Sequence, residues 1–421
     1  MITKTVHVLP KRAAVAVASR LISTTTPHAA SATTAADAAH AEKPHDRHRT
    51  FYHREMIIEP CPANDRIAKP KEGTPLKFGQ FYADHMIEVD FNDVEGWKKP
   101  HLHRIKPLDI HPGAKVLHYA IELFEGMKAY RGIDNKIRLF RPDKNMARMN
   151  RTAARAALPT FDSDELIKMI REQVRLDADW VPASLTSSLY IRPTLIATDK
   201  TLGVGHPHDA KLFVVTGPVG AYFESGFKPV SLLADSKFVR AFPGGVGAYK
   251  MGCNYAPTVG VRLEAAKKEC QEVLWLYGEN EEVTEVGTMN IFVLWKNEQG
   301  ELEFVTPSLK KGIILPGVTR DSLLELAREY NEFKVSERDF TMGELIKAHK
   351  EKRLLQMFGA GTGCVVTPVG RIVHYNKKND RYDELTIPTM ESKINLMQRF
   401  YDHINDIHYG RIDRPGWTVE V

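Results

Sequence analysis

Apolar residues recur at helical spacing in the stretch FDSDELIKMIREQVRLDADWVP, residues 161–182. Three of them share one face of the expected helix: Leu166, Ile170 and Val174. Asp162 and Glu165 are suited to the first turn, and Pro182 is expected to stop the helix. The pattern therefore predicts one amphipathic helix with a buried apolar stripe.

Strand-like apolar runs occur on both sides of one stretch that is dense in Gly and Pro, residues 217–229. Two runs precede this stretch and four follow it: 188–198, 211–220, 230–235, 272–278, 284–296 and 301–307. Residues 315–330 are predicted to form a turn that leads into a helix. The pattern predicts an α/β (α+β) chain with these parts: a leader at 1–49, an N-terminal domain at 50–216, a linker at 217–229 and a C-terminal domain at 230–421.

The leader differs in composition from the rest of the chain. It contains no Asp or Glu before Asp37, although it carries several Lys and Arg residues and is rich in Ala, Ser and Thr. This composition is typical of an organellar transit peptide, so we expect import into the mitochondrial matrix. A disordered tail is the alternative interpretation.

Composition restricts the class of protein and of partner. A chain of 421 residues that is 43% hydrophobic has room for two domains and a sizeable core. The net charge of +5 comes partly from the leader, so it does not indicate a nucleic-acid surface. No apolar run approaches the roughly 20 residues that a membrane span needs. The four cysteines are widely spaced, so we expect neither a metal site nor a disulfide framework.

The stretch GGVGAYKMGCNY, residues 244–255, places Lys250 among four glycines. It is not a P-loop, because Tyr249 and Met251 occupy the positions that require Gly and Ser or Thr. It is not a dinucleotide fingerprint, because Lys250 takes the place of the third glycine of GxGxxG. Two interpretations remain open from these residues. One is a tight turn with a solvated lysine, and the other is an accessible, partly buried lysine that forms a Schiff base with pyridoxal phosphate.

From about residue 55 to the C-terminus, the sequence resembles the branched-chain amino acid aminotransferases, which are fold-type IV pyridoxal-phosphate enzymes. Besides the lysine stretch, seven blocks match that family in the same order: HYAIELFEGMKAYRG, RLFRPDKNMARMNRTAARAALP, SLYIRPTLIAT, EVGTMNIFVLW, ILPGVTRDSLLELA, FGAGTGCVVTPVGRI and IPTM. The resemblance implies a smaller N-terminal α/β domain and a larger C-terminal domain of pseudo-barrel form.

The resemblance also implies the residues that contact pyridoxal 5'-phosphate. Lys250 is expected to form the Schiff base and then to move the proton between the substrate α-carbon and the cofactor. Glu285 is expected beside the pyridine nitrogen and Tyr255 beside the phenolic oxygen. The expected phosphate contacts are Arg148, the backbone of Val318 and Thr319, and Thr362.

An apolar substrate pocket and a homodimer are implied in the same way. Four aromatic residues are expected to form the pocket, Tyr119, Phe124, Tyr190 and Tyr222, and Tyr119 is expected to come from the neighbouring subunit. Arg192 is expected near a substrate carboxylate, and the backbone near Thr288 and Gly363 is expected at the α-carboxylate. Such a pocket selects a branched aliphatic side chain by its shape.

The activity implied is the reversible transfer of the amino group of L-leucine, L-isoleucine or L-valine to 2-oxoglutarate in two half-reactions. Two alternatives are another fold-type IV enzyme, such as a D-amino acid aminotransferase or an aminodeoxychorismate lyase, and a non-catalytic partner-binding protein. The chain departs from the family at one point. Mammalian members carry a CxxC pair where this sequence has Cys364 and Thr367, so a disulfide of that kind cannot form here.

Overall fold

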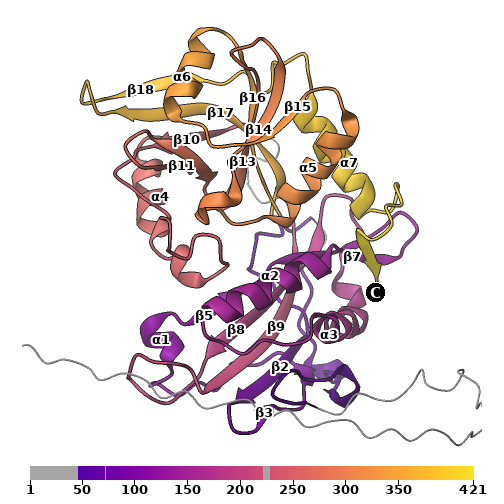
Figure 1. Ribbon diagram of the computed structural model, residues 1–421. Helices are drawn as coiled ribbons and strands as arrows, with labels where there is room; N and C mark the ends of the chain where they lie inside the picture. The colour runs from indigo at the N-terminus through magenta and orange to yellow at the C-terminus, as the bar shows by residue number, and fades with distance from the viewer. Residues whose placement is uncertain (1–45, 72, 221–227) are drawn as a thin grey trace, which may run out of the picture. The chain divides into compact units, whose positions relative to one another are not determined.

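Two β-sheets, each accompanied by helices, build the part of the chain that the computed structural model describes, residues 46–71, 73–220 and 228–421 (Figure 1). From Asp46 to Val421 the chain forms one compact unit. The first sheet draws its strands from the N-terminal half and from the last residues, and the second draws them from the region after Val230. The predicted mixture of helices and strands is confirmed.

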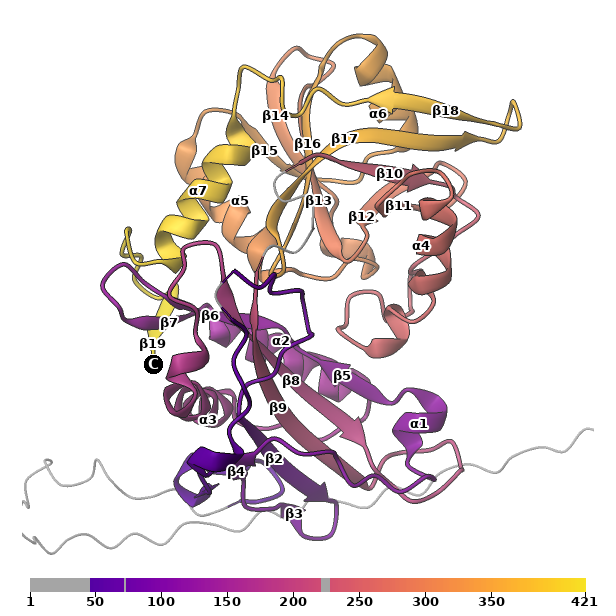
Figure 2. The ribbon, with the colours of Figure 1, turned by 180° about the vertical axis from the view of Figure 1, so that it is seen from behind.

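The first sheet has the strand order β1-β4-β2-β9-β8-β6-β7-β19, with β3 beside β2 and β5 beside β8. Its strands are β1 Ile57–Ile58, β2 His85–Asn92, β3 Gly96–Trp97, β4 His101–Arg104, β5 Glu122–Phe124, β6 Met127–Arg131, β7 Ile137–Phe140, β8 Ser188–Ala197, β9 Asp209–Val219 and β19 Thr418–Glu420. The long antiparallel pair of β8 and β9 matches two predicted strands. β19 pairs with β7, so the last residues of the chain return to the first sheet (Figure 2).

Gly217, the first residue of the predicted linker, lies within β9 and pairs with Tyr190 of β8. A Cβ atom at Gly217 would lie 1.9 Å from the carbonyl oxygen of Phe81. The glycine is therefore required because another segment of backbone passes close to the strand. Residues 221–227 of the predicted linker lie outside the described residues.

The second sheet closes on itself. Its order is β12-β11-β10-β17-β16-β13-β14-β15, and β12 also pairs with β13, so the strands from β12 to β13 form a ring. The strands are β10 Val230–Ala234, β11 Glu272–Tyr277, β12 Glu282–Val286, β13 Met289–Lys296, β14 Leu302–Thr306, β15 Lys334–Glu337, β16 Leu354–Gly361, β17 Val365–Asn376 and β18 Arg381–Thr386. This ring is the barrel-like C-terminal architecture that the family resemblance implied.

Helices cover both sheets (Figure 1). They are α1 Lys115–Tyr119, α2 Pro142–Arg155, α3 Ser163–Leu176, α4 Thr258–Ala266, α5 Val318–Tyr330, α6 Met342–Lys350 and α7 Leu396–His408. Apolar faces of α2 and α3 share one core with the first sheet, and α5 and α7 pack on a cluster of Phe292, Phe304 and Phe358 from the second. None of the helices in the described ranges is long and apolar enough to cross a membrane.

The amphipathic helix predicted at 161–182 corresponds to α3, which is shorter than expected. Its predicted face is confirmed, since Leu166, Ile170 and Val174 are fully buried. Asp162 caps the helix by accepting a hydrogen bond from the N–H of Asp164. The helix ends at Leu176 rather than near Pro182, because a separate 3-10 turn over Ala178–Trp180 follows.

The run at 284–296, predicted as one strand-like stretch, is divided between β12 and β13. Gly287 has φ +54 and turns the chain between the two strands, which pair as a hairpin. The prediction missed this turn because apolar residues continue through it on both sides. The turn brings Glu285 and Asn290 opposite one another in the pairing register.

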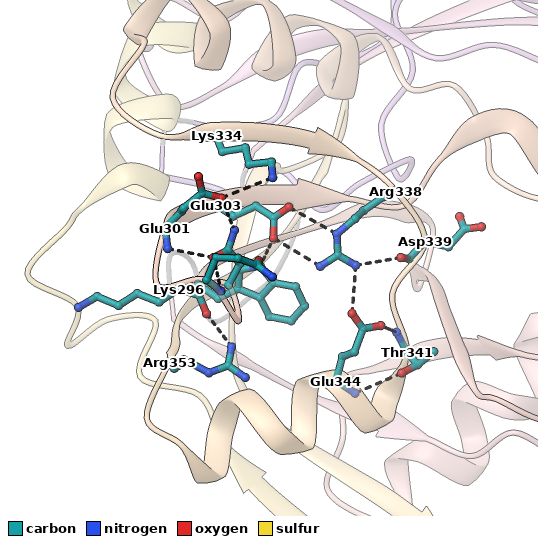
Figure 3. Close-up of polar contacts among 12 residues, drawn as sticks. Lys296, Glu301, Glu303, Lys334, Arg338, Asp339, Thr341, Glu344 and Arg353 are labelled. Atoms are coloured by element: carbon teal, nitrogen blue, oxygen red, sulfur yellow. Dashed lines mark hydrogen bonds and ion pairs between the residues drawn. The ribbon is translucent and has the colours of Figure 1, made fainter.

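A network of charged residues lies at the β13–β14–β15 edge of the second sheet (Figure 3). The carboxylate of Glu303 is buried and accepts a hydrogen bond from Trp295 Nε1 at 2.7 Å. Arg338 donates to this carboxylate and, at 3.0 Å, to Glu344. Glu344 also completes a capping box with Thr341 at the start of α6. The network satisfies a buried charge and fixes the α6 helix to the sheet.

Candidate active site

A cavity of about 200 Å³ opens between the two sheets and contains most of the predicted site residues. Twelve of them line it: Phe124, Arg148, Tyr190, Arg192, Lys250, Tyr255, Glu285, Thr288, Val318, Thr319, Thr362 and Gly363. They come from β5, α2, β8, the Lys250 loop, β12 and the turn after it, the start of α5 and the turn between β16 and β17. The fold therefore brings together residues that are far apart in the sequence.

Two predicted substrate residues are not in this cavity. Tyr119 is 37% exposed at the end of α1, where its hydroxyl donates to the carbonyl oxygen of Leu202. Tyr222 lies outside the described residues. A role for Tyr119 in the site therefore requires a second subunit.

Lys250 is held at both its backbone and its side chain. Its N–H donates to Thr152 Oγ1 of α2 at 3.2 Å, and its Nζ donates to the Tyr255 hydroxyl at 3.2 Å. The Nζ also lies 4.7 Å from the centroid of the Phe124 ring. Burial, together with the positive charge of Arg148, lowers the pKa of Lys250 to about 8. A turn with a solvated lysine is thereby excluded, and the amine is readily made neutral.

The glycines around Lys250 allow close packing of the loop. A Cβ at Gly247 would lie 2.4 Å from the Cβ of Ala241, and one at Gly252 would lie 1.8 Å from a carboxylate oxygen of Glu122. Gly244 has φ +82 and provides a turn that other residues rarely adopt. The glycines let the loop approach its neighbours, so that Lys250 points into the cavity.

Glu285 forms one end of the cavity and is held by three donors. Its Oε1 accepts from Asn290 Nδ2 and from the N–H of Leu315, each at 3.1 Å. Its Oε2 lies 2.6 Å from Arg240 Nη2. Burial raises the pKa of Glu285, and Arg240 opposes this effect. Neither Arg240 nor Asn290 was identified from the sequence, where each is a polar residue without a recognisable pattern.

Arg148 and the start of α5 form another part of the wall. Arg148 lies in a buried ion pair with Glu125, with Nε–Oε1 at 2.7 Å and Nη2–Oε2 at 2.8 Å. Gly317 precedes α5 without a capping side chain, so the N–H groups of Val318 and Thr319 lack that partner. An uncapped helix start beside a guanidinium favours an anion. Glu125 was not predicted, although it directly follows Phe124 in the sequence.

The aromatic side of the cavity contains Phe124, Tyr190 and Arg192. Arg192 Nη2 donates to the Tyr190 hydroxyl at 3.0 Å, and its guanidinium lies 4.5 Å from the centroid of the Phe124 ring. A Cβ at Gly126 would lie 2.1 Å from the Tyr190 hydroxyl, so this glycine leaves room for the tyrosine. These residues combine an apolar surface with one cation.

Residues Gly361–Val365 connect β16 to β17 and contribute Thr362 and Gly363 to the cavity. Val365 has φ +64, which is unusual for a β-branched residue and marks local strain in the backbone. Cys364 lies on the same turn, with its Sγ 3.2 Å from Met289 Sδ. Burial raises the pKa of the Cys364 thiol.

Known proteins of similar sequence point to one family. Residues 122–372 match the family Amino-transferase class IV. The chain is 63% identical over 379 residues to a cytosolic branched-chain-amino-acid aminotransferase of Caenorhabditis elegans, covering 90% of this chain and 91% of that one. It is 52% identical over 343 residues to a mitochondrial branched-chain-amino-acid aminotransferase of Bos taurus, covering 81% and 86%. Cytosolic and mitochondrial proteins are thus both among its relatives.

Solved structures agree at the level of the fold. A crystal structure of the branched-chain aminotransferase of Thermoproteus uzoniensis superimposes with a TM-score of 0.62 at 21% identity. The match covers 80% of this chain and 99% of that one. Both sheets therefore belong to a fold with known examples.

Proposed function

The chain belongs to the branched-chain-amino-acid aminotransferases of the class IV aminotransferase family, and we propose that the cavity around Lys250 is where it performs this reaction. The single observation that carries the assignment to this cavity is the half-buried Lys250, whose amine contacts the Tyr255 hydroxyl inside the cavity and has a pKa of about 8. The reaction transfers the amino group of leucine, isoleucine or valine to 2-oxoglutarate. High identity over most of the chain favours this activity over the D-amino acid aminotransferase, the lyase and the non-catalytic alternatives.

Residues in the cavity fit pyridoxal 5'-phosphate, the cofactor of this family. The uncapped start of α5 and Arg148 suit its phosphate. The Glu285 carboxylate suits a protonated ring nitrogen, and the Tyr255 hydroxyl suits the phenolic oxygen. Burial, together with the charge of Glu285, raises the pKa of Tyr255 to about 12, so this hydroxyl keeps its proton and can donate it in a hydrogen bond. When bound, the cofactor supplies an aldehyde that takes up the amino group and a ring that withdraws electrons from the substrate α-carbon.

Lys250 is proposed as the group that holds the cofactor and then moves the α-carbon proton. Because its pKa is about 8, a substantial part of the amine is neutral near that pH and can accept a proton. The hydrogen bond from its N–H to Thr152 fixes the start of the side chain. Thr152 also donates to the carbonyl oxygen of Arg148 at 2.8 Å, so one helix positions both the lysine and the guanidinium.

The substrate side chain is proposed to lie against Phe124 and Tyr190, and a carboxylate to lie near Arg192. Thr288 and the backbone near Gly363 are proposed at the α-carboxylate. Tyr119 is proposed to complete the pocket of a neighbouring subunit in a homodimer, since its ring is exposed at the end of α1. Light scattering at working concentration tests the dimer, and a dilution series with loss of activity at the monomer would support the shared pocket.

Turnover by the full chain tests the catalytic assignment. With pyridoxal phosphate present, the protein is expected to convert L-leucine and 2-oxoglutarate, and Lys250→Ala is expected to abolish turnover. Lys267→Ala removes an exposed lysine paired with Glu264 and is the matched control. Near-normal turnover by Lys250→Ala would sink the assignment.

Mitochondrial import is proposed from the acid-poor composition of residues 1–49. A fluorescent protein fused after residue 49 is expected to colocalise with a matrix marker. Replacing the basic residues Lys11, Arg12 and Arg20 with Ala is expected to leave the fusion in the cytosol. A diffuse distribution of the unmodified fusion would contradict the proposal.

A further inference from the structure

Lys128 is a buried lysine that the proposed reaction does not use. It lies on β6, is 6% exposed, and its Nζ donates to the carbonyl oxygen of Gly363 at 2.8 Å. Gly363 lies 235 residues away, on the turn between β16 and β17 of the second sheet. The bond therefore joins the first sheet to the cavity wall of the second.

The Lys128 ammonium is costly to bury. Among the residues that the structure describes, no carboxylate forms an ion pair with it. Burial lowers the pKa of Lys128 to about 8, and the same ammonium contributes, after burial, to the lowered pKa of His408. A buried ammonium that no carboxylate neutralises costs stability, so ion pairing does not explain why a lysine occupies this position.

Lys128 lies next to the main cavity, where its charge can act on a bound anion. With Asn145, it lines a second cavity of about 20 Å³, the size of a single water site. This cavity shares Thr319 and Thr362 with the main cavity. The ammonium thus lies behind a part of the main cavity wall that includes Thr319 and Thr362, next to the Gly363 carbonyl that it contacts.

The hydrogen bond also fixes a peptide group. A planar trans peptide points its carbonyl and its N–H in opposite directions, so the bond to the Gly363 carbonyl sets the orientation of the peptide between Gly363 and Cys364. The same turn contains the strained Val365, with φ +64. A backbone in such a conformation needs neighbours that hold it.

We propose that Lys128 is a positioning residue for the α-carboxylate of the substrate: it holds the Gly361–Val365 turn through the Gly363 carbonyl and supplies positive charge behind it. The inference rests on the proposed function, because it assumes that the substrate carboxylate meets this turn. It assigns to β6 a part in substrate binding, although Lys128 itself does not line the main cavity.

Full-length protein loaded with pyridoxal phosphate provides the test, with 4-methylvaleric acid and its neutral amide as probes. In Lys128→Met, the Kd of the acid is expected to rise about tenfold, and the Kd of the amide is expected to stay within about twofold. The KM for leucine is expected to rise in parallel, with a smaller change in kcat. Lys211→Met, on the same sheet but paired with Glu88 and Asp90, is the matched control.

Thermal unfolding separates this role from a structural one. Because Met removes a buried charge that no carboxylate neutralises, the Tm of Lys128→Met is expected to stay within about 2 °C of the wild type or to rise. A variant that fails to fold or melts clearly earlier overturns the proposal, as does an equal loss of affinity for acid and amide. Wild-type protein that does not turn over leucine would refute the proposed function itself, whereas an unaltered Kd for the acid in Lys128→Met refutes only the inference.

Discussion

Glu125 and Glu272 are both buried, but the pKa of Glu125 is lowered and the pKa of Glu272 is raised, so opposite effects on stability are expected when each is replaced. Glu125 and Glu272 are 0% and 1% exposed. Glu125 forms two hydrogen bonds with Arg148 and accepts a third from Asn145 at 2.8 Å. Glu272 lies 3.7 Å from Arg262 and interacts with the backbone of Val273, but none of the described residues donates a hydrogen bond to its Oε2. We expect Glu125→Gln to destabilise the protein and Glu272→Gln to leave it unchanged or more stable.

The signs follow from the pKa of each carboxyl. Burial alone would raise the pKa of Glu125, but Arg148 and Asn145 outweigh burial, and the pKa lies below its ordinary value of 4.5. Its charge therefore stabilises the fold above that value, and this stabilisation is lost as the pH falls through the folded pKa. Burial raises the pKa of Glu272, so its charge costs stability as the pH rises through the folded value.

The magnitude for Glu125 comes from the buried pair. Removing one partner leaves the Arg148 guanidinium buried and uncompensated, which costs about 3–5 kcal/mol. For a unit of this size, that corresponds to a fall of about 4–6 °C in Tm. The difference from the wild type is expected to hold between pH 7 and about pH 5 and to shrink at lower pH.

Differential scanning calorimetry of the cofactor-free proteins, at one scan rate, measures both effects. Glu272→Gln is the matched control, because it replaces an equally buried glutamate with the same amide. Equal Tm losses in the two variants at pH 7 would show that burial, rather than the Arg148 pair, sets the effect. A Glu125→Gln protein as stable as the wild type would refute the reasoning.

Three further changes have definite expected outcomes. Arg338→Met is expected to lower the free energy of unfolding by about 2–3 kcal/mol, because it leaves the buried Glu303 without its guanidinium, with kcat/KM unchanged in a standard turnover assay. Arg240→Met is expected to lower kcat/KM about tenfold, a cost of about 1.4 kcal/mol, because the Glu285 carboxylate loses the group that orients it; full activity in the variant would contradict this. Cys364 is expected to react slowly with iodoacetamide at pH 7 in the folded protein, since burial raises its pKa; mass spectrometry showing labelling as fast as in the unfolded chain would contradict this.

Regular periodicity made much of the fold predictable. The buried face of α3 and the extents of β8 and β10 follow directly from apolar spacing. The turn at Gly287 was missed because it interrupts the backbone without interrupting the apolar pattern. Closure of the second sheet depends on β12 pairing with both β11 and β13, which local sequence does not specify.

The site was predictable only as far as residues could be matched to motifs. Lys250 and Glu285 lie in distinctive stretches, so they were found and they meet in the cavity. Glu125, Arg240 and Lys128 were missed because their importance comes from partners far away in the sequence, such as Arg148, Glu285 and Gly363. Which charged residues are buried together is decided by the fold, so the order of residues along the sequence does not reveal it.

The pairing of β19 with β7 has a consequence for the order in which the protein is made. Residues Thr418–Glu420 are synthesised after every other strand of the first sheet, yet they cover one of its edges. Until then, the β7 edge presents unpaired backbone groups that can join another chain. A chain from which β19 is missing or not yet made therefore exposes the β7 edge to pairing with another chain.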